Sequence, residues 1–328
     1  MDAYLAKKNK LKDKVVVITG ASSGVGLAAA EAFAKEGCFL VLAARGEAGL
    51  AEATGRCLDL GALAFSVPTD MSVAEEVQNL VSKALEYNGT IDVWVNNAGV
   101  MATGKFEDMP FEALDQIIKT NLLGYMHGAR CVLPVFRKQS YGVLINNISI
   151  GGWMPAPYGA AYSASKYGIR GMVETLQGEV SDAKNIHICA LYPSIQRSTG
   201  NMHSAKYSGL DFKIPPMASD PKELAKAMVE MAKHPRKSLF TSWSSFIFKS
   251  LYSLFPNTIV NVNSAVLRLM MSNNSSTDTN GNVLRHSPPP LRIYGETMLP
   301  VPSRTTKAVV LSGIGILGAY WLLRSNKK

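Results

Sequence analysis

The sequence predicts an α/β fold, in which helices cover both faces of a doubly wound parallel sheet. Two observations lead to this prediction. From residue 15 onward, short β-branched runs alternate with longer amphipathic stretches, which is the pattern of repeated strand–helix–strand units. A glycine-rich turn also follows the first of these runs and leads into an alanine-rich stretch. The 328 residues, 47% of them hydrophobic and 18% charged, suffice for one large domain with an extension and exclude global disorder.

Six segments have the apolar, β-branched composition of strands buried between helices. They are residues 15–19, 39–43, 64–67, 93–96, 143–147 and 187–191. Helices are expected between them. One is predicted at 25–36, closed by a glycine at position 37, and another at 221–233, opened by Asp220 as its N-cap.

The composition divides the chain into four parts. Residues 1–13 form a basic N-terminal tail, and residues 14–240 form the Rossmann-type α/β domain. Residues 241–303 are an extension, with an aromatic and apolar stretch, a polar loop or linker at 272–282 and a proline triplet. Residues 304–328 are a terminal segment that we expect to anchor the chain in a membrane.

The expected anchor is the uncharged run 308–323, which has basic residues on both sides. As a helix it would span roughly 24 Å, against about 30 Å for a bilayer core, and the basic ends with Tyr320 and Trp321 would extend its reach. A buried or dimer-forming helix is the alternative. The N-terminus has no secretory signal, so the catalytic domain is expected in the cytoplasm.

The formal net charge of +9 points to an anionic cofactor or a membrane surface rather than to nucleic acid, because the basic clusters lie at the termini. The four cysteines stand singly, without a C-x-x-C or histidine spacing. We therefore expect no metal site and no disulfide, with reduced cysteines in the core at Cys38, Cys57, Cys131 and Cys189.

The glycine-rich turn lies between a strand and a helix, where a dinucleotide would place its pyrophosphate. Glycines let the backbone turn tightly and approach the phosphates, whose charge is favoured at a helix N-terminus. A turn that merely needs glycine is the alternative. The candidate cofactor-binding residues here are Gly20, Ser22, Ser23, Gly24, Val25 and Gly26.

Arg45 follows the second predicted strand, where an NAD site would carry an acid for the adenosine ribose. A carboxylate would repel a 2′-phosphate, whereas a guanidinium binds it. We therefore expect NADP(H) in preference to NAD(H). A solvated loop charge is the alternative for this residue.

Tyr162 and Lys166 are the candidate reactive pair, one helical turn apart on the same face. A nearby ammonium favours the phenolate and lowers the tyrosine pKa, which makes it a usable acid or base. The spacing alone is weak, since Tyr4 and Lys8 share it. Only Tyr162 has a serine, Ser149, thirteen residues upstream at the expected carboxyl edge of the sheet.

The order of these elements resembles the short-chain dehydrogenase/reductase family over residues 14–240. Besides the glycine turn, Ser149, Tyr162 and Lys166, the resemblance rests on Asp70, the Asn-Asn-Ala-Gly motif that contains Asn97, Ala98 and Gly99, and Asn121. It implies an oxidoreductase that interconverts a carbonyl with a secondary or primary alcohol, and Arg45 makes NADP(H) the expected cofactor. An inactive NADP-binding, membrane-associated scaffold or redox sensor is the alternative.

The resemblance also implies roles for the catalytic residues. Tyr162 would donate or remove a proton and Ser149 would hold the reacting oxygen. Lys166 would bind the nicotinamide ribose and hold the tyrosine pKa down, and Asn121 would position a water. Taken singly, Ser149 would equally serve to cap a loop and Asn121 to bend a helix.

Further cofactor contacts are implied for Asp70, for the backbone of 97–99, and for Ile195 and Ser198 after the sixth strand. Asp70 has an alternative reading as the N-cap of a helix beginning near residue 73. Ser194 stands where relatives usually have glycine, which puts the backbone path there in doubt.

The substrate is expected to be a small apolar alcohol or ketone, or a lipid-like molecule. Trp153 and Met154 would line an apolar pocket, or simply pack. The stretch through Met202, His203, Tyr207 and Phe212 resembles the family's variable lid, and we expect His203 at the surface. The resemblance further implies a homodimer or homotetramer.

Overall fold

The computed structural model describes residues 10–210, 214–271, 277–287 and 291–297. Several of the predictions lie outside these ranges: most of the basic tail, with Tyr4 and Lys8, the lid residue Phe212, and the expected anchor at 308–323. Among the helices that are described, none has the length and apolarity needed to cross a bilayer.

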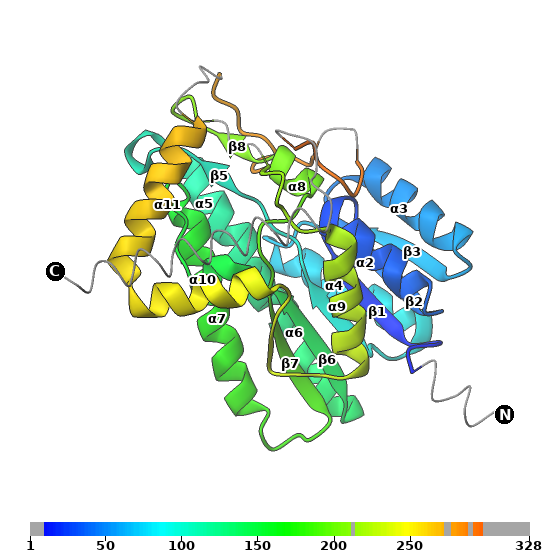
Figure 1. The fold of residues 1–328 in the computed structure, drawn as a ribbon. Coiled ribbons are helices and arrows are strands. Elements are labelled where there is room, and N and C mark those ends of the chain that lie inside the picture. The colour runs from blue at the N-terminus through cyan, green and yellow to red at the C-terminus, as the bar shows by residue number, and fades with distance from the viewer. Residues whose placement is uncertain (1–9, 211–213, 272–276, 288–290, 298–328) are drawn as a thin grey trace.

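Seven parallel strands form one sheet in the order β3-β2-β1-β4-β6-β7-β9 (Figure 1). Their bounds are β1 Val15–Thr19, β2 Phe39–Ala44, β3 Leu63–Pro68, β4 Val93–Asn96, β6 Gly142–Asn147, β7 Ile186–Tyr192 and β9 Ser238–Phe240. The six predicted strands are confirmed, and they lie in the single parallel sheet that the prediction of a doubly wound α/β fold requires. The three-residue β9 is too short for a periodic pattern to reveal.

Helices cover both faces of this sheet. On one face lie α2 (Gly24–Ala34), α3 (Glu47–Asp59) and α9 (Pro221–Lys233); on the other lie α4 (Ala74–Asn88), α6 (Gly124–Gln139) and α7 (Ala160–Glu179). The alternation along β1 explains why both faces need a cover. Val16 and Ile18 pack into one core while Val15 and Val17 pack into the other, so every side chain of this apolar strand is buried.

The remaining elements surround the carboxyl edge of the sheet. They are the short pair β5 (Ala102–Thr103) and β8 (Ala205–Lys206), α5 (Phe111–Ile118), the π-helical turn η2 (Lys119–Leu123), the short helices η1 (Phe106–Asp108), η3 (Ile150–Gly152) and α8 (Thr199–Met202), and the C-terminal helices α10 (Trp243–Leu254) and α11 (Pro256–Met271).

The end of the predicted extension returns to the domain. We call residues 277–287 and 291–297 the C-terminal strap. In Figure 1 it is the orange trace that runs from the β8 side toward α3. Backbone hydrogen bonds join Thr279 to Lys206 and Gly295 to Arg197. The described part of the polar run 272–282 is therefore fastened to the domain and is no free linker.

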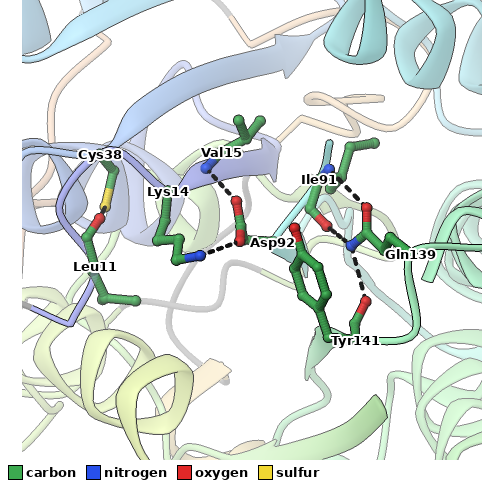
Figure 2. A network of polar contacts seen from close by, with 8 residues as sticks. All are labelled: Leu11, Lys14, Val15, Cys38, Ile91, Asp92, Gln139 and Tyr141. Atoms are coloured by element: carbon green, nitrogen blue, oxygen red, sulfur yellow. Dashed lines mark hydrogen bonds and ion pairs between the residues drawn. The ribbon is translucent and has the colours of Figure 1, made fainter. Parts of the chain in front are cut away.

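A polar network fixes the amino-terminal end of β1 (Figure 2). The Asp92 carboxylate accepts a 2.9 Å hydrogen bond from the buried Val15 N–H and lies 2.9 Å from the Lys14 ammonium. Lys14 is 45% exposed, so its ion pair contributes little. The hydrogen bond to Val15 matters more, because its loss leaves a buried N–H without a partner.

We expect Asp92→Ala to lower the free energy of unfolding by about 1–3 kcal/mol. Urea denaturation followed by circular dichroism measures this. Asp182, which pairs with Arg137 at an exposed site, gives the matched control: Asp182→Ala should leave the midpoint unchanged. A Lys14→Ala loss as large as that of Asp92→Ala would assign the stabilisation to the ion pair instead.

Candidate active site

A cleft of about 880 Å³ opens at the carboxyl edge of the sheet. Its walls come from the glycine turn, the end of β2, the segments after β4, β6 and β7, helix α7 and the strap. Fifteen of the predicted site residues line it: Gly20, Ser22, Ser23, Val25, Gly26, Arg45, Asp70, Asn97, Ala98, Gly99, Ser149, Tyr162, Lys166, Ile195 and Ser198. Gly24 and Asn121 do not.

The glycine turn brings backbone against backbone. Gly20 has a φ of +68°, and a Cβ at Gly26 would lie 2.0 Å from the Gly20 carbonyl oxygen. A side chain at position 24 would meet the Ser198 hydroxyl at 2.3 Å. These glycines are thus required by close approach, and Gly20, Val25 and Gly26 face the cleft at the N-terminus of α2, where a phosphate would be favoured.

Thr19 and Asn97 tie the glycine turn to the end of β4. The Thr19 hydroxyl accepts from the backbone N–H groups of Asn97 and Ala98, and the Asn97 amide donates to the Thr19 carbonyl at 2.9 Å. Asn147, at the end of β6, donates its side-chain amide to Asn97. Three strands are therefore held at the floor of the cleft by side chains rather than by the sheet alone.

Ser149 sits in an unusual backbone conformation for a non-glycine residue, with φ +109° and ψ 157°. Its hydroxyl accepts from the Gly151 N–H at 3.1 Å, and its polar interaction with the Tyr162 phenol acts to lower the pKa of that tyrosine. Such a conformation costs on the order of 1–3 kcal/mol, and surrounding structure must hold it. Ser149 caps its loop, as the alternative reading has it, and it also faces Tyr162.

Lys166 lies beneath Tyr162 at the same wall. Its Nζ is 3.4 Å from the Asn147 carbonyl oxygen, and 5.1 Å and 5.6 Å from the ring centres of Tyr125 and Tyr162. The Tyr125 hydroxyl donates to the same Asn147 carbonyl at 2.8 Å. Burial lowers the pKa of Lys166 to about 7.

The expected direction of the tyrosine pKa is wrong for this structure. Burial raises the pKa of Tyr162, and the hydrogen bond from Ser149 acts in the opposite, weaker sense. The physical reason is that the same burial which destabilises the phenolate also destabilises the Lys166 ammonium. A lysine that is largely neutral above pH 7 exerts little pull on the tyrosine.

Asn121 lies behind the cleft, in the π-helical turn between α5 and α6. Its side chain is fully buried: the oxygen accepts from the Val100 N–H, and the nitrogen donates to the Val100 carbonyl and to the Ser165 hydroxyl. Both amide N–H donors are thereby used. Its side chain positions the Val100 segment and α7, and does not reach the cleft.

The structure decides two open questions, one about the role of Asp70 and one about the backbone at Ser194. Asp70 lines the cleft, and its Oδ1 accepts from the Ser72 N–H and hydroxyl, while Val73 is the N-cap of α4. The alternative of Asp70 as N-cap is therefore wrong. Ser194 takes no left-handed conformation and bonds Ser219, so the backbone path there accommodates a serine.

Of the residues predicted near the substrate, some line the cleft and others pack elsewhere. Met154 lines the cleft, whereas Trp153 packs between Arg170, at 3.3 Å from its ring centre, and Lys249, at 4.2 Å. His203 was expected at the surface and this is wrong, because it is 9% exposed beneath the strap. Burial lowers its pKa, and the charge of Arg292 adds to that effect.

Arg45 reaches the strap as well as the cleft. Its terminal nitrogens donate to three strap carbonyls, those of Asn282, Val283 and Arg285, at 2.6, 3.2 and 2.8 Å. The reading as a solvated loop charge is therefore wrong. The sequence could not predict this contact, because its acceptors are backbone carbonyl oxygens, which every residue has. Sequence reasoning also missed Asn147 and Tyr125, although an asparagine ending the strand before Ser149 was a usable signal.

A parallel α/β sheet with a glycine cradle and a Ser–Tyr–Lys group at its carboxyl edge defines a class of oxidoreductases. A family model described as short chain dehydrogenase matches residues 14–207. The oxidoreductase YxnA of Bacillus subtilis (strain 168) is 31% identical over 256 residues, which cover 76% of this chain and 71% of YxnA. The chain belongs to the short-chain dehydrogenase family and is an oxidoreductase of that family.

Solved structures agree on the fold. An alcohol dehydrogenase from the archaeon Thermococcus sibiricus, complexed with 5-hydroxy-NADP, is 29% identical with a TM-score of 0.62, covering 70% of this chain and 96% of its own. A short chain dehydrogenase/reductase from Burkholderia phymatum in complex with NAD is 24% identical with a TM-score of 0.67, covering 82% and 98%. At 24% identity, the second likeness shows the fold alone.

Proposed function

We propose that this protein is an NADP(H)-dependent oxidoreductase that interconverts a carbonyl with a secondary or primary alcohol, and that Tyr162 is its general acid and base. The observation that carries the proposal is that Ser149, Tyr162 and Lys166 line one wall of the cleft together, with the Lys166 Nζ 5.6 Å from the Tyr162 ring centre. The same arrangement disfavours an inactive scaffold, because a binding role requires none of these groups.

The cleft fits a nicotinamide dinucleotide. The glycine cradle leaves no room for a Cβ, and the buried Asn147 side-chain oxygen has no hydrogen-bond partner among the described residues. The bound cofactor would supply or accept the hydride. Gly20, Val25 and Gly26 would hold its phosphates, Lys166 its nicotinamide ribose, and Asp70 its adenine.

The proton chemistry belongs to this chain's own residues. In reduction, the Tyr162 hydroxyl gives its proton to the carbonyl oxygen while the Ser149 hydroxyl hydrogen-bonds that oxygen and stabilises its growing charge. A protonated Lys166 then stabilises the tyrosinate. Asn121 acts as a positioning residue, by holding Val100 and Ser165.

NADP(H) is proposed over NAD(H) because Arg45 directly follows β2 at the cleft, where an NAD site would carry a carboxylate for the unphosphorylated ribose. The Thermococcus sibiricus alcohol dehydrogenase is complexed with 5-hydroxy-NADP, which supports this choice. The Burkholderia phymatum protein is in complex with NAD, so the fold takes either nucleotide.

We expect the purified chain to oxidise NADPH in the presence of apolar ketones or aldehydes, with a kcat/KM at least tenfold above that for NADH, since tenfold corresponds to about 1.4 kcal/mol. Loss of absorbance at 340 nm measures this across a substrate panel. Absence of carbonyl-dependent oxidation with either nucleotide would contradict the proposed reaction, and a preference for NADH would contradict only the cofactor.

The pH dependence should report Lys166. Its pKa of about 7 means that the ammonium is lost as pH rises through neutrality, so kcat/KM for reduction should fall above pH 7. Lys166→Arg keeps the charge at every working pH, and we expect its profile to lose this limb although its rate is lower. A wild-type profile that is flat from pH 6 to 9 would contradict the assignment.

Three expectations remain predictions: an apolar or lipid-like substrate, assembly into a homodimer or homotetramer, and membrane association through residues 308–323. Met154, which lines the cleft with an apolar side chain, supports the first of these.

A further inference from the structure

The C-terminal strap crosses the end of the cleft that lies beside Arg45 and the glycine turn. It leaves β8 at Thr279, reaches the end of β2 at Arg45 and the start of α3 at Gly49, and returns to the glycine turn, where the Arg292 carbonyl accepts from the Gly24 N–H at 3.0 Å. The same carbonyl accepts from the Thr199 hydroxyl at 2.6 Å. One strap carbonyl thus joins the start of α2 to the start of α8.

Arg45 holds the strap in this position without losing its charge. The three carbonyls it bonds are neutral, no described ion pair includes its guanidinium, and the Asp70 carboxylate acts on it only through its charge. Three of its five N–H donors are used, so two remain. A cation that is oriented but not neutralised favours an anion beside it.

Polar side chains of the strap line the cleft next to this cation. The His286 ring lies over Gly46, with its Cβ 3.3 Å from where a Cβ on that glycine would stand. Ser287 lines the cleft beside it and accepts from the Asn282 amide at 3.2 Å. Asn282 is 5% exposed and lines the cleft, and its side-chain oxygen has no hydrogen-bond partner in the part of the chain that is described.

We propose that the strap is the outer wall of the adenosine subsite, with His286 and Asn282 as specificity-determining residues. Asn282 takes a hydrogen bond from the adenosine ribose, and His286 donates to the 2′-phosphate, whose charge faces Arg45. This inference rests on the proposed function, because it assumes that the cleft takes NADP(H). It explains why the buried Asn282 amide oxygen is left unpaired, which is unfavourable until a donor arrives.

Two nucleotide fragments test the strap without a substrate. Calorimetric titration of the full chain with 2′,5′-ADP and with 5′-AMP compares adenosine with and without the 2′-phosphate. We expect His286→Ala to weaken 2′,5′-ADP by about tenfold, as for one hydrogen bond to a charged group, and to leave 5′-AMP unchanged. Asn282→Ala should weaken both fragments, because both contain the ribose.

Glu296 offers the matched control, since it lies on the strap and its side chain pairs with Arg292 away from the cleft. Glu296→Gln should bind both fragments as the wild type does. Hydrogen exchange on the wild type avoids any question of folding: 2′,5′-ADP should slow exchange at the strap amides of Asn282 and Val283.

The outcomes separate the two proposals. If the wild type binds the fragments but both variants match it, or if strap amides exchange at the same rate with and without 2′,5′-ADP, the strap wall is wrong and the proposed function stands. If the wild type binds 5′-AMP as tightly as 2′,5′-ADP, the NADP preference is wrong. The proposal that the strap is the outer wall of the adenosine subsite is then tested by Asn282→Ala alone, which should weaken binding of both fragments. If it binds neither, both proposals are wrong.

Discussion

Tyr162→Phe should lower kcat for carbonyl reduction by about 10²- to 10⁴-fold, the usual contribution of a positioned acid or base. The substitution removes one hydroxyl and keeps the half-buried ring in its place beside the Lys166 ammonium. The Kd for NADPH should therefore stay near that of the wild type, because the phenol reaches the reacting oxygen rather than the dinucleotide. Stopped-flow hydride transfer, with binding measured by fluorescence, separates the two effects.

Tyr167→Phe is the matched control on the same helix. Its hydroxyl bonds the Trp153 carbonyl at 2.6 Å outside the cleft, so we expect kcat within about threefold of wild type, in line with the loss of one ordinary hydrogen bond. Equal activities of the two variants would remove Tyr162 from the reaction.

Gly26→Ala is expected to abolish measurable cofactor binding and to destabilise the fold. The added Cβ would stand 2.0 Å from the Gly20 carbonyl oxygen and 2.7 Å from its carbon. Both are backbone atoms of a turn that Thr19 and Asn97 hold in place, so the turn and α2 must separate. Overpacking of this kind typically costs about 1–3 kcal/mol. Thermal unfolding with and without NADPH measures both losses.

Gly171 provides the contrasting substitution. It lies inside α7 with nothing within 4 Å of a new Cβ, so Gly171→Ala should raise stability by about 0.5–1 kcal/mol through helix propensity. Cofactor affinity should not change. We expect Gly26→Ala to lower the unfolding temperature and Gly171→Ala to raise it. If both variants raised it, the close approach of backbone atoms at Gly26 would not restrict the size of the side chain there.

The sheet could be predicted from the sequence because its strands are apolar on both faces. The five residues of β1 are all buried, and such runs between helices leave few other assignments. The strand β9 could not be found this way, since three residues show no period. The burial of His203 was missed because the strap that covers it is distant in the chain.

The floor of the cleft was predictable for a different reason, namely that its motifs are local. Tyr162 and Lys166 are one turn apart, and the glycine turn is a single segment. The outer wall was not predictable. Arg45 meets strap carbonyls 237 to 240 residues away, and a carbonyl carries no side-chain signature. The predicted direction of the Tyr162 pKa shift was wrong for a similar reason, because a sequence motif does not show how deeply its residues are buried.

The strap has a consequence for the order in which this protein is completed during synthesis. The chain emerges from the ribosome N-terminus first. Every strand of the sheet is therefore available once residue 240 has emerged. The hydrogen bonds from Arg45 to the Asn282 carbonyl and from the Gly24 N–H to the Arg292 carbonyl can form only after those later residues have been synthesised. A nascent or prematurely terminated chain would therefore have a finished sheet and a cleft with one side missing.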